Sequence, residues 1–394
     1  MTINAQTYWD MFTRAVVPIK TNRAVTVGIL GFLTFIGVIT GLGRLLMGLS
    51  ASTALTDSYP WGIWIGFDFT LIAFAGTGFT MAAVVHVFHQ EKFAPAMRPA
   101  ILAGLMGYIA VLLLLVLDLG RPDRFYHFIL FWNLHSPLFE ISWCVLLYTT
   151  VLVIEVSPCL FQKLNMERPV QIAQKIMAPV TIIGVTLSTL HQSTLGTLYL
   201  NMPHRLDQLW YTPILPLLFF VSSIMAGLAL AILAYKVSIR LQNKTQNLDL
   251  VRGLCRILFW TMVVYTILKM GELAFSGELP LLLSLDKMSL LWSAELIIGA
   301  IIPIGLWLIP GIRRHWFMQW VGPVLVLSGV MFNRFNATMF GQQFTNAGGV
   351  TYDPHILEWL STIGIVAGAM LVWYLGTRFL VIFAADTECG GANH

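Results

Sequence analysis

Charged side chains are scarce in this sequence. Asp, Glu, Lys and Arg fill 11% of its 394 positions, whereas hydrophobic residues fill 57%. A soluble domain has about 25% charged residues, so this chain has too few polar groups to cover the surface of one. The composition excludes an ordinary soluble protein and indicates a polytopic membrane protein.

Clustered cysteines and nucleotide-binding motifs are missing as well. The four cysteines form no C-x-x-C pair and have no spacing suited to an iron–sulfur cluster or a structural zinc ion: Cys144, Cys159, Cys255 and Cys389. We interpret them as small buried hydrophobic residues. No Walker or dinucleotide-binding glycine pattern occurs, so nothing indicates transport driven by nucleotide hydrolysis.

Long apolar runs, by contrast, recur along the whole chain, and each can cross a ~30 Å hydrocarbon core as a helix. They lie at about 24–47, 61–88, 98–118, 136–158, 173–197, 211–237, 251–275, 288–310, 316–339 and 355–384. We predict an all-α polytopic membrane protein with about ten transmembrane helices, arranged as two four-helix bundles plus two flanking helices. The predicted domains are an N-terminal segment at 1–23, one membrane domain at 24–385 and a tail at 386–394.

The positions of Lys and Arg predict the orientation, because these residues are retained on the cytoplasmic side. With the N-terminus inside, most of the 23 fall in cytoplasmic segments, and the opposite loops hold Arg121, Arg124, Arg205 and Lys287. We expect a prokaryotic cytoplasmic (inner) membrane protein with both termini in the cytoplasm.

The segment 1–23 carries apolar residues at three-to-four spacing beside Arg14 and Lys20. This spacing predicts a short amphipathic helix on the cytoplasmic membrane surface, with a frayed tail as the alternative. We expect no cleavable signal peptide, because the first apolar run is longer than the apolar region of such a signal.

Ionisable residues inside the spans gather toward the non-cytoplasmic face, where a charge in hydrocarbon costs about 2.5–3.5 kcal/mol and therefore indicates function. Span 61–88 starts at Pro60-Trp61-Gly62 and places Asp68 roughly 10 Å below that start. Trp64 suits the membrane interface. A lone carboxyl at this depth can hold and release a proton, and the alternative is an Asp68 paired with an arginine for packing.

The next two spans add further acids. Span 98–118 ends at Asp118, and Arg121 follows three residues later on the same face, so the two can pair to fix a loop or bind a polar head group. Glu140 enters the following span within its first turn or two. Glu155 lies near the cytoplasmic end of that span, and we interpret it as a solvated helix end, with a role in a proton path as the alternative.

Span 173–197 ends in an unusually polar run, Leu190-His191-Gln192-Ser193. Histidine titrates closest to neutral pH, and the neighbouring amide and hydroxyl groups can orient it or a ligand. The polar neighbours favour a functional His191 over a satisfied interior histidine.

A second ionisable set lies in the later spans and comprises Lys269, Glu272, Glu295 and Arg334. Lys269 and Glu272 are three residues apart and can neutralise each other, while Arg334 can pair with Glu295 or Glu272. We favour structural ion pairing for this set, and a proton path is the alternative.

The histidines argue against a haem, which needs axial ligands at matching depth. His86 and His89 lie at the cytoplasmic end of a span, whereas His191 lies toward the opposite face. We therefore expect no haem, although a ligand pair from the outer loops stays open as an alternative.

Acid–base groups near one membrane face, among aromatic and aliphatic helices, suit a lipid-soluble carrier of two electrons and two protons. A quinol releases two protons as it gives up two electrons, so its oxygens need acceptors within hydrogen-bond reach. Asp68 and His191 are the candidates to face the two ring oxygens. The electrons must pass to or from a cofactor-bearing partner at the outer face.

These motifs and the ten spans resemble the polysulfide-reductase (NrfD-like) family of quinone-interacting membrane subunits, closest to the ten-span branch typified by the hydrogenase-2 integral membrane subunit (HybB-like). The residues that carry the resemblance are Pro60-Trp61-Gly62 with Asp68, Asp118-Leu119-Gly120-Arg121 and Leu190-His191-Gln192-Ser193. The resemblance covers essentially the whole chain, and the first five spans carry its more specific motifs.

The resemblance implies a haem-free subunit, inactive alone, that exchanges electrons between menaquinone or ubiquinone and a ferredoxin-like iron–sulfur subunit docked on the periplasmic face. That partner would connect to a catalytic subunit of hydrogen or sulfur metabolism. Coupling of turnover to proton translocation is a separate hypothesis, which depends on a path from the cytoplasmic side through Glu155 or His86. No nucleic acid is expected as a partner. The implied site residues are Asp68, His191 and Glu140 for catalysis, and Trp64, Asp68, Asp118, Arg121, His191 and Gln192 for quinone binding.

Three other classes remain open. A proton-coupled secondary transporter places its site near the midplane on interrupted helices, whereas here the polar groups crowd one face and the expected helix breakers sit at span ends. A b-type cytochrome predicts a haem absorption band. A passive anchor of a redox complex predicts that Asp68 and His191 are dispensable for quinone turnover.

Overall fold

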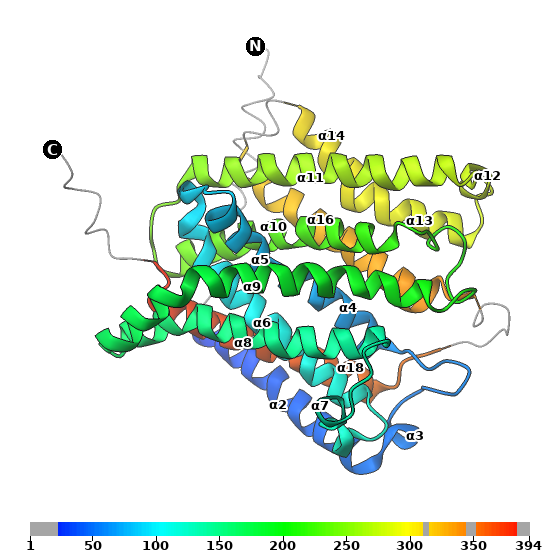
Figure 1. Ribbon diagram of the computed structural model, residues 1–394, viewed down its shortest axis with the longest axis horizontal. Coiled ribbons are helices and arrows are strands. Elements are labelled where there is room, and N and C mark those ends of the chain that lie inside the picture. Colours follow the sequence, from blue (N-terminus) through cyan, green and yellow to red (C-terminus); the bar gives the residue numbers. More distant parts are fainter. Residues whose placement is uncertain (1–22, 310–314, 344–351, 384–394) are drawn as a thin grey trace.

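The computed structural model describes residues 23–309, 315–343 and 352–383. Within these ranges every extended regular element is helical, and no β-sheet forms. The helices lie largely side by side (Figure 1). The all-α prediction is thereby confirmed for this part of the chain. The predicted amphipathic segment, apart from Arg23, and the predicted tail lie outside the described residues.

Nine helical segments of the described chain are long and apolar enough to cross a membrane. They are α2 (Arg23–Met47), α4–η1 (Ile63–Val87), η2–α6 (Glu91–Asp118), α8 (Pro137–Lys163), α9 (Glu167–Leu200), α10 (Leu215–Leu241), α11 (Leu248–Phe275), α13–α14 (Lys287–Leu308) and α18 (Ile356–Phe379). The expected tenth segment is also helical, as α16 (Met318–Phe335) followed by the π-helical η5 (Asn336–Phe340). It is more polar than the others, because Asn333, Arg334 and Asn336 lie near its end.

Short helices cap one end of the assembly. These are α3 (Leu49–Ser52), α7 (His127–Leu130) and α12 (Leu279–Leu282), together with the 3-10 turn η3 (Pro122–Arg124). All three α-helical pieces lie at the right in Figure 1. We call this end the short-helix end, and it is the end that the sequence predicts to be non-cytoplasmic.

Two of the spans are interrupted internally. In the first, α4 (Ile63–Ala75) and α5 (Thr77–Ala82) meet at Gly76 before the π-helical η1 (Ala83–Val87). A Cβ on Gly227 of α10 would lie 2.9 Å from the carbonyl carbon of Gly76, so both glycines are needed for this close backbone approach. The expectation that helix breakers sit only at span ends is therefore wrong.

The second interruption separates α13 (Lys287–Leu296) from α14 (Ile302–Leu308) by the π-helical η4 (Ile297–Ile301). Pro303 follows within the first turn of α14. Proline has no N–H to donate, and a local π-helical adjustment is one way in which a membrane helix accommodates it.

The helices pack in two groups with a flanking pair. In the first group, α6 (Ala94–Asp118) contacts α4, α5 and α8, and α9 packs along α8. In the second, α10 contacts α11 and α16, and α13 and α14 also pack against α16. The helix α10 joins the groups through α4, α6 and α9, while α2 packs mainly on α18.

Polar caps explain where several helices begin. The Oδ1 of Asn247 accepts from the backbone N–H groups of Asp249 (3.1 Å) and Leu250 (3.0 Å) at the start of α11. The Oδ1 of Asp286 accepts from Ser289 N (2.8 Å) at the start of α13. These side chains satisfy N–H groups that a helix leaves unpaired in its first turn.

Glycine also fixes the flanking pair. A Cβ on Gly37 of α2 would lie 2.9 Å from the carbonyl carbon of Gly364 on α18. Small residues of this kind let membrane helices approach closely enough for extensive van der Waals contact.

We therefore expect Gly37→Leu to force α2 away from α18 and to lower the free energy of unfolding by about 1–3 kcal/mol, as overpacking typically does. Gly43→Leu is the matched control, because a Cβ on Gly43 of the same helix would meet no described atom within 4 Å. Thermal denaturation of the purified protein in detergent measures both. Equal midpoints for the two variants would contradict the assigned contact.

Candidate functional site

Asp68 lies on α4 and is 3% exposed. Its Oδ1 is buried and has no hydrogen-bond partner among the described residues. The carboxyls of Asp68 and Asp118 are close enough for their charges to interact. An acid in this position is unusual in hydrocarbon, because a buried carboxylate without a cationic partner is strongly disfavoured.

His191 and Gln192 on α9 are fully buried and reach the same helix as Asp68. Gln192 Nε2 donates to the carbonyl oxygen of Ile72, 3.0 Å away and one turn beyond Asp68 on α4. Tyr108 of α6 lies beside Gln192, and its ring centroid is 6.0 Å from that of His191. The structure therefore brings Asp68 and His191 into one interior region between α4, α6, α8 and α9.

Two tyrosine hydroxyls extend this region. The sequence analysis did not include these tyrosines. The rings of Tyr108 and Tyr148, from α6 and α8, pack edge to face at 5.0 Å. Several buried polar atoms of the region have no hydrogen-bond partner in the described ranges: Tyr108 Oη, Tyr148 Oη, Ser188 Oγ, Gln192 Oε1 and both ring nitrogens of His191. The available sequence signal was a tyrosine inside an otherwise aliphatic run on each helix. We call these groups, with Asp68, the α4–α9 polar region.

Glu155 lies farther along the same α8–α9 interface, away from the short-helix end. It is 8% exposed, and its Oε1 accepts a hydrogen bond from Thr181 Oγ1 (3.0 Å). Its interpretation as a solvated helix end is therefore wrong. Apolar sequence neighbours do not reveal that two helices bury an acid between them, which depends on their relative rotation.

Glu140 occupies the first turn of α8, as expected, but its side chain is exposed. Its Oε1 accepts from Thr194 Oγ1 (2.8 Å), two residues beyond Gln192 on α9. Glu140 therefore lies beside the polar region rather than inside it.

At the short-helix end, Asp118 has the buried Arg44 rather than Arg121 as its neighbouring cation, although the two form no ion pair within 4 Å. Arg44 of α2 is 1% exposed and donates from Nη2 to Leu119 O (2.6 Å), and its charge interacts with that of Asp118. Asp118 Oδ1 and Arg44 Nε are buried and have no hydrogen-bond partner within the described chain. The Arg44 guanidinium also lies 5.9 Å from the ring centroid of Trp64.

Arg121 is exposed on the loop after α6 and pairs with Asp123 at 2.8 Å. Its guanidinium holds the pKa of Asp123 below the usual range. The expected Asp118–Arg121 pair is therefore wrong, because α6 ends at Asp118 and the extended Leu119 turns the chain away from the helical register.

Trp64 is 1% exposed, so it does not lie at a water-facing interface as expected. Its Nε1 donates to Ser361 Oγ of α18 (3.1 Å). Next to it, the fully buried Glu358 accepts from Tyr352 Oη (2.6 Å) and from Ala54 N (2.9 Å). Burial and the neighbouring Glu358 raise the pKa of Tyr352.

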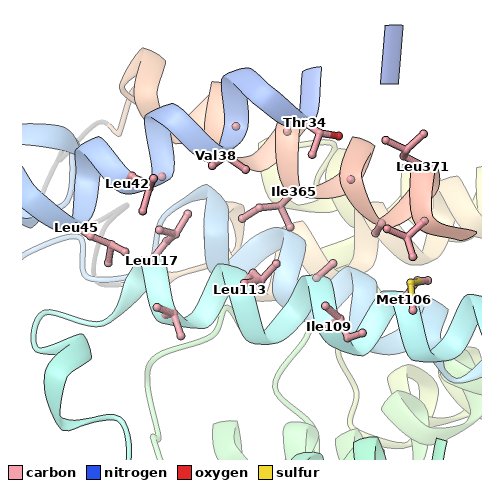
Figure 2. A pocket seen from close by; sticks show the side chains of 18 residues that line it. Thr34, Val38, Leu42, Leu45, Met106, Ile109, Leu113, Leu117, Ile365 and Leu371 are labelled. Carbon is pink, nitrogen blue, oxygen red and sulfur yellow. The ribbon is translucent and has the colours of Figure 1, made fainter. Parts of the chain in front are cut away.

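Two large apolar cavities adjoin the first helix group. One, of about 440 Å³, lies between α2, α6 and α18 (Figure 2). The other, of about 380 Å³, lies between α4, α6, α10, α16 and α18. Neither is lined by Asp68 or His191, and both share Met106, Ala110 and Ala369 as a common wall.

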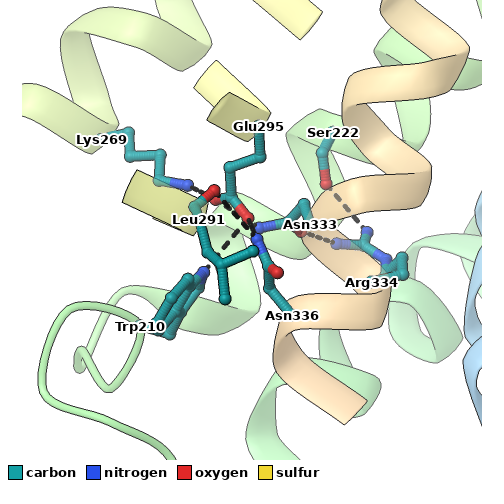
Figure 3. Close-up of polar contacts among 8 residues, drawn as sticks. All are labelled: Trp210, Ser222, Lys269, Leu291, Glu295, Asn333, Arg334 and Asn336. Carbon is teal, nitrogen blue, oxygen red and sulfur yellow. Dashed lines mark hydrogen bonds and ion pairs between the residues drawn. The ribbon is translucent and has the colours of Figure 1, made fainter. Parts of the chain in front are cut away.

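The second ionisable set forms a dense polar cluster around Glu295 of α13 (Figure 3). Lys269 Nζ forms an ion pair with Glu295 Oε1. Three further side chains donate to the same carboxylate: Trp210 Nε1 at 3.1 Å, Asn333 Nδ2 at 3.0 Å and Asn336 Nδ2 at 2.7 Å. Four donors hold this buried charge, so the expected Lys269–Glu272 neutralisation is wrong and Lys269 pairs with Glu295.

Arg334 extends the cluster without an acid partner within 4 Å in the described part of the chain. Its guanidinium donates to Asn333 Oδ1 (2.5 Å), Ser222 Oγ (2.8 Å) and Phe219 O (3.1 Å) and lies 3.8 Å from the Phe219 ring centroid. The expected pairing of Arg334 with Glu295 or Glu272 is therefore wrong. Polar groups and an aromatic face take the place of a carboxylate.

A buried cation also lies toward the opposite end. Lys236 of α10 is 2% exposed. Its Nζ donates to Trp316 O (3.3 Å) and lies 4.5 Å from the Trp320 ring centroid. Together with Glu155, it shows that the buried ionisable groups are less one-sided than expected.

The described residues contain no group of three or more His, Cys, Asp or Glu side chains arranged to hold a metal ion. Cys144, Cys159 and Cys255 are buried and free, in agreement with their interpretation as small hydrophobic residues. Cys389 lies outside the described residues.

The described helices are apolar and long enough to cross a membrane, and they enclose ionisable groups both with and without hydrogen-bond partners. These features define an all-helical, multi-pass membrane protein. Residues 51–346 match the model of the family described as polysulphide reductase, NrfD. The chain belongs to this family.

Several similar proteins are covered almost end to end. A protein of Nitratidesulfovibrio vulgaris is 30% identical over 365 residues, which is 90% of this chain and 94% of the relative. The probable Ni/Fe-hydrogenase 2 b-type cytochrome subunit of Escherichia coli is 28% identical, over 90% of this chain and 91% of the relative. The integral membrane subunit of menaquinone reductase of N. vulgaris is 26% identical, over 91% and 92%.

We expect Lys269→Met to lower the free energy of unfolding by about 3–5 kcal/mol, because it leaves the Glu295 charge buried without its cation. Glu272→Gln, which changes a half-buried acid outside this pair, is the control and should shift stability by about 0.5 kcal/mol or less. Chemical denaturation in detergent measures both. A Glu272→Gln variant as unstable as Lys269→Met would show that Glu272 is the true counter-ion.

Proposed function

We propose that this chain is the integral membrane subunit of a quinone-linked respiratory oxidoreductase complex and is inactive alone. The observation that carries the proposal is the α4–α9 polar region, in which a buried carboxyl and a buried imidazole share one helix interface. Family membership supports it, since one similar protein is a menaquinone reductase subunit and another a hydrogenase subunit. The substrate is a quinone or quinol, with menaquinone favoured by the first of these names.

The chemistry follows from the groups present. Oxidation of a quinol releases two electrons and two protons. Asp68 takes the first proton and His191 takes the second, and the hydroxyl of Tyr108, which lies beside both groups, can relay it. Gln192 holds α9 against α4 through its hydrogen bond to Ile72 O. Trp64 and Asp118 border the quinone head group near the short-helix end. Glu140 and Arg121 are exposed and lie around the site without contacting the head group.

The two electrons leave through an iron–sulfur subunit docked at the short-helix end, because the described residues bring together no cluster of metal ligands that could retain them. That subunit connects to a catalytic subunit. We place the short-helix end on the non-cytoplasmic side, with both termini in the cytoplasm and ten spans, α16–η5 being the tenth. The ten spans form two four-helix bundles with α2 and α18 as the flanking helices.

We propose a haem-free subunit, although the E. coli relative carries the name of a b-type cytochrome. Both large cavities have linings without histidine. His191 is fully buried beside Tyr108, and no second histidine of the described residues packs against its ring. This arrangement suits proton exchange better than axial ligation of a haem.

Proton movement across the membrane is the finer part of the proposal. Hydroxyl groups of Tyr108, Ser188 and Tyr148 lie between Asp68 and Glu155, and Tyr148 lies close to Glu155. A sequence of buried hydroxyls and carboxyls can relay protons between the two membrane sides. Glu155 is the cytoplasmic entry of this path, whereas the Lys269–Glu295 cluster is structural.

We expect Asp68→Asn and His191→Ala each to reduce quinol-linked electron transfer by about 100-fold or more, since each removes a proton acceptor. Asp57→Asn and His135→Ala change the same residue types on exposed loops and are the controls. Turnover is measured on the purified complex, and co-purification of the partner subunits reports assembly. Full turnover in assembled Asp68→Asn and His191→Ala complexes would favour a passive anchor.

For proton movement, we expect Glu155→Gln to abolish the membrane potential generated during turnover in proteoliposomes while quinol oxidation continues. Glutamine keeps the acceptor for Thr181 but cannot carry a proton. A potential-sensitive dye measures the effect. An unchanged potential in Glu155→Gln removes Glu155 from the path, and a wild-type complex that builds no potential removes the path itself.

A further inference from the structure

The cavity between α2, α6 and α18 is elongated along the helices (Figure 2). Its lining on α6 runs from Met106 to Leu117, which at ~1.5 Å per residue is about 16 Å, and its lining on α2 runs from Thr34 to Leu45 over a similar length. This is roughly half the thickness of a ~30 Å hydrocarbon core. An extended hydrocarbon chain fits such a slot better than a compact ligand does.

The walls of the slot are made by glycines and aliphatic side chains. Gly37 and Gly364 lie at the close contact of α2 with α18, Gly41 faces Leu117 of α6, and Val38, Leu42 and Leu113 line the slot. Thr34 is the one hydroxyl residue of the lining, and its Oγ1 already donates to Leu30 O (2.7 Å). The slot therefore offers its occupant dispersion contacts and no free polar group.

Near the short-helix end, the slot is followed by charged side chains. One turn beyond Gly41, Arg44 continues the buried face of α2, and Asp118 follows Leu117 directly on α6. Both side chains present a buried atom, Arg44 Nε and Asp118 Oδ1, for which the described residues supply no partner. The lining of the slot ends at Leu45 on α2 and Leu117 on α6, so this donor and this acceptor lie just beyond it, each adjacent in sequence to a lining residue.

We propose that this slot holds the isoprenoid tail of the quinol, with the head group at the Arg44–Asp118 end. The inference rests on the proposed function and adds to it the place of the tail. The Arg44 guanidinium donates to a hydroxyl oxygen of the quinol ring, and Asp118 accepts from a ring hydroxyl. Asp68, whose charge interacts with that of Asp118, then lies behind the head group as the next proton acceptor.

A phospholipid acyl chain fits this arrangement less well. Its phosphate head group is bulky and strongly hydrated, whereas Arg44 is 1% exposed and already held by Leu119 O. A neutral quinone ring needs only a few directed hydrogen bonds and can enter such a dry end.

The second cavity lacks this polar end. Its one hydroxyl side chain, Thr70, donates to Gly66 O (2.8 Å). It lies on the other side of α18 and has a similar volume. It therefore provides a control site in the same molecule.

The test fills each cavity with one substitution. Leu113→Trp fills the slot, and Leu233→Trp fills the second cavity; both replace a partly exposed leucine that lines only one of the two. The KM of the whole purified complex is measured with menaquinol and with menadiol, which has the same ring without the tail. We expect Leu113→Trp to raise the ratio of the menaquinol KM to the menadiol KM by about tenfold, and Leu233→Trp to leave this ratio at its wild-type value.

A second measurement is independent of activity. A menaquinone analogue with a photoreactive tail is irradiated in the wild-type complex, and labelled peptides are identified by mass spectrometry. We expect adducts on α2, α6 and α18 at residues of the slot, and their loss in Leu113→Trp.

Three results would overturn the assignment. An unchanged KM ratio in Leu113→Trp with loss of co-purifying phospholipid would make the slot a lipid site. Adducts confined to the second cavity would place the tail there. A wild-type complex that neither oxidises the two quinols nor reduces the corresponding quinones would overturn the proposed function itself, and the tail assignment with it.

Discussion

A polar group inside the hydrocarbon of a membrane finds no water, so the protein itself must supply its partners. This constraint divides the buried ionisable groups into two kinds. Around Glu295, four donors converge on one carboxylate, and Arg334 makes three hydrogen bonds of its own. Around Asp68 and His191, several polar atoms have no partner in the described part of the chain. The first arrangement fixes the helices of the second group, whereas the second leaves buried polar atoms unsatisfied within the described chain.

Close backbone contacts position these groups. Gly76 and Gly227 let the α4–α5 helix approach α10, and Gly37 and Gly364 hold α2 against α18. Because α2 contacts α6 far less than it contacts α18, a slot remains between α2 and α6. The small residues that join α2 to α18 therefore leave space between α2 and α6.

The sequence predicts the helices well and their partners poorly. Apolar runs locate the membrane-length segments, since hydrophobic length is a local property. Helix ends are predicted less accurately: the span expected at 173–197 is the helix Glu167–Leu200, because a helix continues with polar residues after it leaves the hydrocarbon.

Pairing between helices depends on the rotation of each helix about its own axis, which no local sequence pattern reveals. For this reason Lys269 pairs with Glu295 instead of Glu272, and Glu155 and Lys236 are buried. Asp68 and His191 were predicted to lie together, and they do share an interior, but Tyr108 between them had no motif to reveal it.

The carboxylate of Glu358 joins three separate pieces of chain at the short-helix end. It accepts from Ala54 N, from Tyr352 Oη and from the backbone N–H of His355, while Tyr352 Oη in turn accepts from Ile63 N at the start of α4. Asp68 lies five residues further along that helix. The first turn of α4, and with it the position of Asp68, therefore depends on one tyrosine hydroxyl that Glu358 of α18 holds in place.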